Sequence, residues 1–118
     1  MTNTLEQLKS FSTLVADTAD LSLLMQQTAQ DATTNPSLIY AASSTPAYQA
    51  FIEAGKAQLI AGVSITKVVQ EILAKAGQEI LSIVPGRVSA EVDARLSFDT
   101  QATIIYACLL YTSPSPRD

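Results

Sequence analysis

The chain has 118 residues, the length of one ordinary domain, so one domain or a piece of one is expected. Seven Lys and Arg residues against eleven Asp and Glu give a net charge of −4 without a long run of one sign, so neither nucleic acid nor a membrane surface is expected as a partner. The absence of histidine excludes Ser/His and Cys/His nucleophilic schemes and removes the commonest metal ligand, so no metal is expected.

The remaining composition indicates a cytoplasmic protein. Cys108 is the only cysteine, which permits no internal disulfide and suits a reducing cytosol. The N-terminal residues lack the basic and apolar regions of a secretory signal, and no apolar run reaches the ~18 residues of a transmembrane span. No GxGxxG or GxxxxGK[ST] loop supports a nucleotide site. Carboxylate, amide, hydroxyl and lysine chemistry remain.

The first sixty residues alternate short strands with helices. Short β-branched and apolar runs predict the strands, and amphipathic or proline-initiated segments predict the helices. Asn35-Pro36 and Thr45-Pro46 each combine an N-cap residue with proline at the first helical position. The expected order is helix 5–11, strand 13–17, helical turn 21–26, strand 31–35, helix 36–42 and helix 46–60.

The second half predicts a long helix, a strand and a last helix. Gly62 ends the preceding helix, and from Ile65 the apolar residues follow the i, i+3, i+4, i+7 spacing of a one-sided helix. Pro85-Gly86 predicts a turn, and residues 87–93 alternate strictly between apolar and polar. Ser97 is expected to cap a helix that starts at Phe98. Because each parallel strand needs a helical crossover, this order predicts an α/β protein with a parallel sheet.

The composition changes after Tyr106. Pro114 and Pro116 lie among serines near an Arg-Asp terminus, a pattern incompatible with continuing the amphipathic helix. We therefore expect two parts, a folded part over 1–106 and a disordered or non-native tail over 107–118 that is joined to a truncated coding sequence.

Alternation places polar residues on one face of all three expected strands. If Asp17, Asn35 and Glu91 share this face, the opposite face is apolar. A doubly wound sheet buried on both faces has nearly continuous apolar strands, whereas a closed parallel barrel can place polar groups at the mouth of its interior. The pattern favours the barrel. Taken alone, Asp17 and Asn35 would also suit helix caps or turns, and Asp93 with Arg95 suits a structural ion pair.

Three segments resemble the characteristic blocks of the transaldolase family. They are VADT at 15–18, DATTNPSLI at 31–39 and VPGRVSAEVDARLS at 84–97. The similarity extends from about Leu5 to about Ile104. It implies a TIM (β/α)8 barrel, of which this chain would hold an N-terminal helix and roughly the first three strand-helix units.

The resemblance also implies a reaction without a cofactor. A dihydroxyacetone unit would pass from sedoheptulose 7-phosphate to glyceraldehyde 3-phosphate through a lysine Schiff base, in the pentose phosphate pathway. Fructose 6-phosphate and erythrose 4-phosphate would be the other sugar phosphates, and a homodimer is one option for the full-length parent. Asp17 would be the acid/base group at the carbon-carbon bond, and Glu91 would transfer protons through an ordered water. Asn35 would bind a substrate hydroxyl, and Thr33 would line the same pocket.

The Schiff-base lysine is not expected in this chain. In the family it lies on the fourth strand, with the phosphate-binding residues further on, whereas the four lysines here fall on predicted helices: Lys9, Lys56, Lys67 and Lys75. We therefore expect the chain alone to be inactive. Two alternatives stay open: a non-catalytic barrel fragment that acts as a binding or assembly module, and fructose 6-phosphate aldolase activity in place of strict transaldolase activity.

Overall fold

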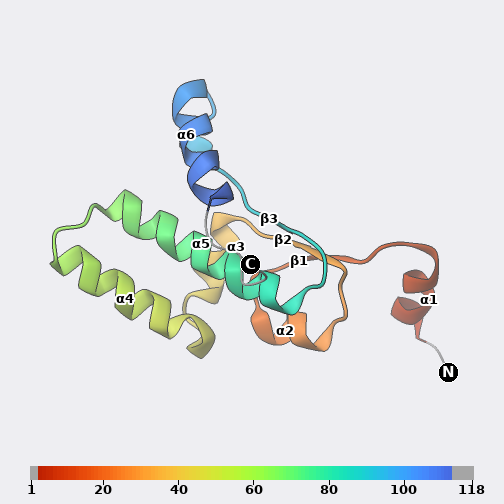
Figure 1. Ribbon diagram of the computed structural model, residues 1–118. Helices are drawn as coiled ribbons and strands as arrows, with labels where there is room; N and C mark the ends of the chain where they lie inside the picture. Colours follow the sequence, from red (N-terminus) through yellow and green to blue (C-terminus); the bar gives the residue numbers. More distant parts are fainter. Residues whose placement is uncertain (1–2, 113–118) are drawn as a thin grey trace.

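The computed structural model of the chain describes residues 3–112 (Figure 1). Pro114 and Pro116 of the expected tail lie outside the described residues. The elements run in the order α1 (Thr4–Phe11), β1 (Val15–Asp17), α2 (Leu21–Gln26), β2 (Asp31–Thr33), α3 (Pro36–Ala42), η1 (Pro46–Tyr48), α4 (Gln49–Ile60), α5 (Ile65–Ile83), β3 (Val88–Ser89), η2 (Ala94–Leu96) and α6 (Thr100–Tyr111). The structure is therefore a mixed α/β arrangement around a small sheet.

The three strands form one parallel sheet in the order β1-β2-β3. Asp17 is registered opposite Thr33, and Thr33 is registered opposite Ser89. The predicted parallel sheet is thereby confirmed, and its three strands are neighbours in chain order.

The strands are shorter than their sequence patterns predict, and β3 shows this most clearly. Instead of the expected 87–93 it covers only Val88–Ser89. The reason is its neighbour, because β2 ends at Thr33 and the chain then enters α3. The Thr34 N–H donates one more hydrogen bond to the Ser89 carbonyl at 3.1 Å, and beyond it β3 has no partner strand on this side among residues 3–112.

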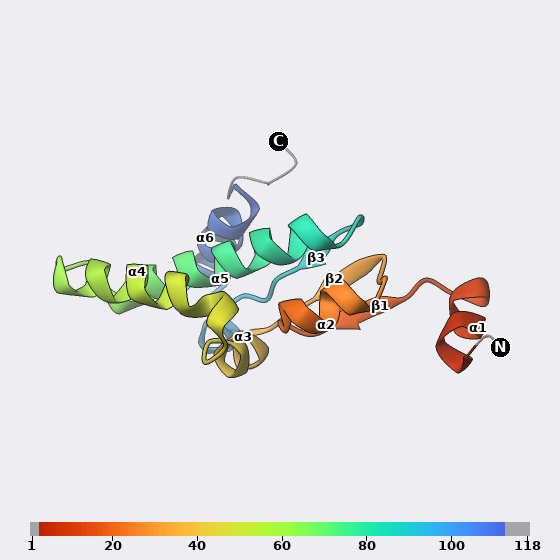
Figure 2. The ribbon, with the colours of Figure 1, turned by 90° about the horizontal axis from the view of Figure 1, so that it is seen from below.

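One face of the sheet packs against the helices. Ala32 is buried, and Ala16 and Val88 pack against the same core, to which α5 contributes Ala76 and Ile80. This burial confirms the prediction that the face opposite the polar residues is apolar. Figures 1 and 2 show α4 and α5 side by side, with α5 continuing over the sheet and α1 standing apart at the other end. Of the predicted α5 stripe, the part over the sheet is buried, whereas Ile65 and Val69 near its start are exposed.

The helix boundaries confirm some of the predicted caps and correct others. The Asn35 side chain caps α3 as expected, accepting a hydrogen bond from Leu38 N–H at 2.9 Å. Gly62 follows α4 with a φ of 87°, a left-handed conformation that suits glycine. Thr45 does not cap, because its Oγ1 donates to the Ala42 carbonyl at 2.7 Å and the short helix η1 intervenes before α4.

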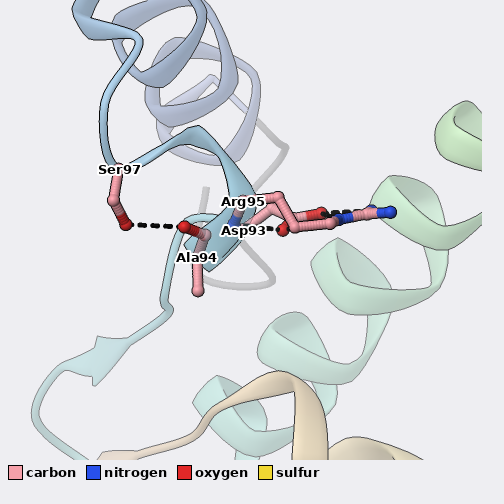
Figure 3. Close-up of polar contacts among 4 residues, drawn as sticks. All are labelled: Asp93, Ala94, Arg95 and Ser97. Atoms are coloured by element: carbon pink, nitrogen blue, oxygen red, sulfur yellow. Dashed lines mark hydrogen bonds and ion pairs between the residues drawn. The ribbon is translucent and has the colours of Figure 1, made fainter.

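The last helix differs from its prediction at both ends. The residue that caps α6 is Asp99, whose Oδ1 accepts from Ala102 N–H at 2.9 Å. Ser97 instead ends η2 and donates to the Ala94 carbonyl at 2.6 Å (Figure 3). The helix also continues past Tyr106 to Tyr111, so its expected end near Tyr106 is wrong. The proposed division of the chain at residue 106 remains a prediction. Within residues 3–112, no helix has the length and apolarity needed to cross a membrane.

Candidate active site at the carboxyl ends of the strands

The carboxyl ends of β1 and β2 bring two of the predicted site residues into contact. Asp17 ends β1 and Thr33 ends β2, and the parallel register places them side by side. The Thr33 hydroxyl donates a hydrogen bond to Oδ1 of Asp17 at 2.9 Å. Asp17 is exposed and Thr33 half-buried, on the face opposite the buried Ala32. The carboxylate is thus oriented by the protein and open to a ligand.

Asn35 lies beyond Thr33, at the start of α3, and is partly buried. Its carboxamide oxygen accepts from Leu38 N–H, so this oxygen is committed to the helix. The amide nitrogen carries two N–H donors. A ligand hydroxyl at this edge of the sheet would therefore meet Asn35 as a donor.

Glu91 lies beyond the end of β3 and is exposed. It lines an open depression of about 430 Å³ together with Asp93, Ser97 and Thr103. Within residues 3–112, no hydrogen bond or ion pair joins Glu91 to Asp17 or Asn35. The structure brings Asp17 and Thr33 together, and the expected convergence of Glu91 on them remains a prediction.

The ion pair of Asp93 and Arg95 holds the chain that follows Glu91 (Figure 3). The Arg95 Nε atom lies 3.0 Å from each carboxylate oxygen of Asp93 and donates to them. The Arg95 backbone N–H donates to Oδ1 of Asp93 at 2.9 Å. These hydrogen bonds, together with the charge of Arg95, lower the pKa of Asp93 to about 2. The expected structural ion pair is confirmed, and Asp93 stays ionised at neutral pH as the cap of η2.

Ser89 is not among the site residues predicted from the sequence. It is exposed and registered opposite Thr33, so Asp17, Thr33 and Ser89 form one row across the sheet. Alternation alone places Ser89 on the polar face. The row itself depends on the strand register, which the sequence does not specify.

None of the four lysines lies on a strand of the sheet. All four are on helices, as predicted: Lys9 on α1, Lys56 on α4, and Lys67 and Lys75 on α5. Lys9 bonds Glu6 and Thr28, and Lys56 bonds Glu53. Among residues 3–112, no cluster of three or more acidic or cysteine side chains could hold a metal ion.

A second hollow lies away from the row. A hollow of about 580 Å³ is lined by Leu14, Gln30 and Pro85, which precede the three strands. It therefore opens at the amino edge of the sheet. In parallel α/β proteins, ligands bind at the carboxyl edge, which favours the row of Asp17 and Thr33 as the site.

The parallel sheet with helices packed on one face defines an α/β protein, and the oriented carboxylate lies at the edge where α/β proteins commonly bind small molecules. The sequence model of the transaldolase/fructose-6-phosphate aldolase family matches residues 14–116. The chain belongs to this family.

The chain is similar to curated transaldolases over about a third of their length. A transaldolase of Prochlorococcus marinus is 52% identical over 112 residues, which cover 88% of this chain and 33% of that protein. The transaldolase of Shewanella pealeana is 48% identical over 112 residues, covering 91% of this chain and 35% of the relative. A probable transaldolase of Dictyostelium discoideum is 44% identical over 110 residues, covering 88% and 34%.

Proposed function

We propose that this chain forms the first three strand-helix units of a TIM barrel transaldolase. The reaction transfers a dihydroxyacetone unit from sedoheptulose 7-phosphate to glyceraldehyde 3-phosphate. Family membership supports this proposal, as does the order of the three parallel strands, since sequential parallel neighbours with helical crossovers are the repeating unit of a barrel.

The observation that carries the proposal is the position of Asp17. Its carboxylate ends a parallel strand, is held by Thr33 through one oxygen and remains exposed. Cleavage and formation of the carbon-carbon bond next to an imine require a group that takes and returns the proton of a hydroxyl. Asp17 performs this step in our account, because it is the oriented carboxylate at the edge where barrel active sites lie.

Asn35 and Glu91 complete the proposed site. The Asn35 amide donates to a hydroxyl of the bound three-carbon fragment while its oxygen stays on α3. Glu91 acts through an ordered water on the proton transfers that form and hydrolyse the imine. Its exposed position beyond β3 suits this role, provided that the neighbouring part of the barrel closes over it.

The imine itself forms on a lysine outside these residues. The four lysines of the chain lie on helices and none is at the carboxyl edge of the sheet. The chain therefore supplies the acid/base and hydroxyl-binding part of the site, and the phosphate-binding residues also come from elsewhere in the barrel. The names of the curated relatives favour transaldolase over fructose 6-phosphate aldolase activity. A cytoplasmic location and a homodimeric parent remain predictions.

A chimera in which the relative supplies the rest of the barrel tests the proposal. Residues 13–106 of this chain replace the matching segment of the Shewanella pealeana transaldolase, which is 48% identical to this chain over 112 residues. We expect dihydroxyacetone transfer, and an Asp17→Ala variant should lose about 100-fold or more in kcat because general acid/base catalysis contributes that much. Thr13 is exposed and lies just before β1, so Thr13→Val serves as the control and should retain the activity.

Two results would contradict the proposal. One is a folded chimera without transfer activity, which would instead favour the non-catalytic binding or assembly module. The other is an Asp17→Ala variant as active as the Thr13→Val control, which would remove Asp17 from the reaction.

A further inference from the structure

We infer that Thr33 acts on the Asp17 carboxylate as a positioning residue and does not donate to the substrate. This inference rests on the proposed function, and it revises the expected role of Thr33 as a residue of the substrate pocket. The evidence is the hydrogen bond from Thr33 Oγ1 to Asp17 Oδ1 at 2.9 Å.

The chemistry of the hydroxyl limits what Thr33 can do. A threonine hydroxyl has one proton to donate and two lone pairs that accept. That proton is committed to Asp17, so Thr33 has none left for a substrate oxygen. The register reinforces the arrangement, because Asp17 and Thr33 are direct partners on adjacent strands and β-branched Thr33 has a stiff χ1 angle.

The contact also distinguishes the two oxygens of Asp17. Oδ1 accepts from Thr33, and Oδ2 accepts no hydrogen bond from residues 3–112. A carboxylate fixed through one oxygen presents the other in a defined direction, which reduces the reorganisation needed when a proton is transferred. Oδ2 is therefore the atom that exchanges the proton with the substrate hydroxyl.

Ser89 extends the row on the other side of Thr33. It is registered opposite Thr33 at the end of β3 and is exposed. The lone pairs of the Thr33 oxygen can accept from a hydroxyl on that side, since its proton points to Asp17. Within residues 3–112, no side-chain hydrogen bond joins Ser89 to Thr33, so the loss of the Ser89 hydroxyl should have a smaller effect than the loss of the Thr33 hydroxyl.

Paired substitutions in the active chimera test the inference. Thr33→Val removes the hydroxyl and keeps the shape and the strand preference, whereas Thr33→Ser keeps the hydroxyl. We expect Thr33→Val to lower kcat by about tenfold with KM within about threefold, and Thr33→Ser to restore kcat to within about threefold. On an Asp17→Ala background, Thr33→Val should change kcat by less than about twofold, because Thr33 acts through Asp17. Ser89→Ala should lower kcat by less than Thr33→Val.

A second measurement does not depend on activity. The urea midpoints of Asp17→Ala, Thr33→Val and the double variant form a cycle, and we expect the double variant to shift the midpoint by less than the sum of the two single variants. Additive shifts would overturn the contact, whether or not the chimera is active.

The outcomes separate this inference from the proposed function. A folded chimera that lacks activity, or an Asp17→Ala variant that keeps it, contradicts the proposed function, and the midpoint cycle then decides whether Thr33 holds Asp17. An active chimera in which Thr33→Val raises KM alone, or in which Thr33→Ser is as impaired as Thr33→Val, overturns the positioning role.

Discussion

The carboxylate of Asp31 accepts a hydrogen bond from the backbone N–H of Arg87 at 2.6 Å, which ties the start of β2 to the turn before β3. The Gly86 N–H donates to the Gln30 carbonyl at 2.8 Å in the same turn. A Cβ on Gly86 would collide with the Asp31 carboxylate and with this carbonyl. Close approach, and not a left-handed backbone, therefore requires glycine at this position.

We predict that Gly86→Ala destabilises the protein. The added methyl group must push apart the turn and the start of β2, and overpacking of this kind costs about 1–3 kcal/mol. Gly77→Ala is the matched control, because Gly77 lies inside α5 and, apart from its chain neighbours and the backbone of its own helix, no atom lies within 4 Å of its Cβ position among the described residues. Replacing a helical glycine by alanine should stabilise by about 0.5–1 kcal/mol. Urea unfolding of the chimera measures both changes, and equal effects of the two substitutions would contradict the close-approach argument.

We predict that the protein loses stability at high pH because the buried Tyr48 hydroxyl resists ionisation in the folded state. Tyr48 is fully buried and donates to the Ala19 carbonyl at 2.8 Å. Burial, with the nearby charges of Asp20 and Glu79, raises its pKa from 10.0 to about 12. Because the folded-state pKa lies above the unfolded value, this contribution is complete below about pH 10 and is lost as the pH rises toward about 12.

Tyr48→Phe tests this assignment. It removes the donor and leaves a buried carbonyl unsatisfied, so we expect a loss of about 1–3 kcal/mol at neutral pH. The variant should also lose less stability than the parent chimera between pH 10 and 12. Thermal midpoints across this range decide the point, and identical pH profiles for the two proteins would show that Tyr48 is not the titrating group.

We predict that Thr34→Val does not destabilise. Thr34 is 3% exposed and its hydroxyl oxygen has no hydrogen-bond partner among the described residues. Burying an unpaired hydroxyl costs about 1–3 kcal/mol, so removing it should leave stability unchanged or raise it. Thr33→Val, which breaks the bond to Asp17, is the control and should not stabilise. A clear loss for Thr34→Val in urea unfolding would show that its hydroxyl has a partner, such as a buried water.

The sequence patterns correctly predicted the strands and the helix start that carry Asp17, Thr33 and Asn35. Alternation placed Asp17 and Thr33 on one face, and Asn35-Pro36 predicted the start of α3, as the structure confirms. Their hydrogen bond could not be predicted, since it depends on which residues of two strands stand opposite one another. Alternation indicates a face but no register.

Two differences between the predictions and the structure, the length of β3 and the cap of α6, have their cause in neighbouring segments of the chain. Residues 87–93 alternate like a strand, but β2 turns into α3 after Thr33 and leaves Glu91 without a ladder partner on that side. Ser97 and Asp99 are both good N-caps, and the structure uses Asp99 because Ser97 already serves as the C-cap of η2. In both cases the local pattern was sound, and tertiary context determined the outcome.

We predict that the 118-residue chain alone forms no reducible imine. Its four lysines lie on helices and none lies on a strand of the sheet, whereas the proposed function places the Schiff-base lysine in the part of the chimera that comes from the relative. Incubation with fructose 6-phosphate and borohydride, followed by intact mass, should show one three-carbon adduct on the chimera and none on the chain. A stoichiometric adduct on the chain would place the imine on one of Lys9, Lys56, Lys67 and Lys75.

The crystal structure of the borohydride-trapped chimera tests the proposed site most directly. Proton transfer requires hydrogen-bond reach, about 2.6–3.2 Å between heavy atoms or the span of one bridging water. We expect Oδ2 of Asp17 and the amide nitrogen of Asn35 within direct reach of hydroxyls of the trapped fragment, with Thr33 still bonded to Oδ1. Glu91 should reach the reduced imine nitrogen through one water. A fragment bound away from Asp17, or a Glu91 that remains out of reach of both the nitrogen and a bridging water, would contradict the account.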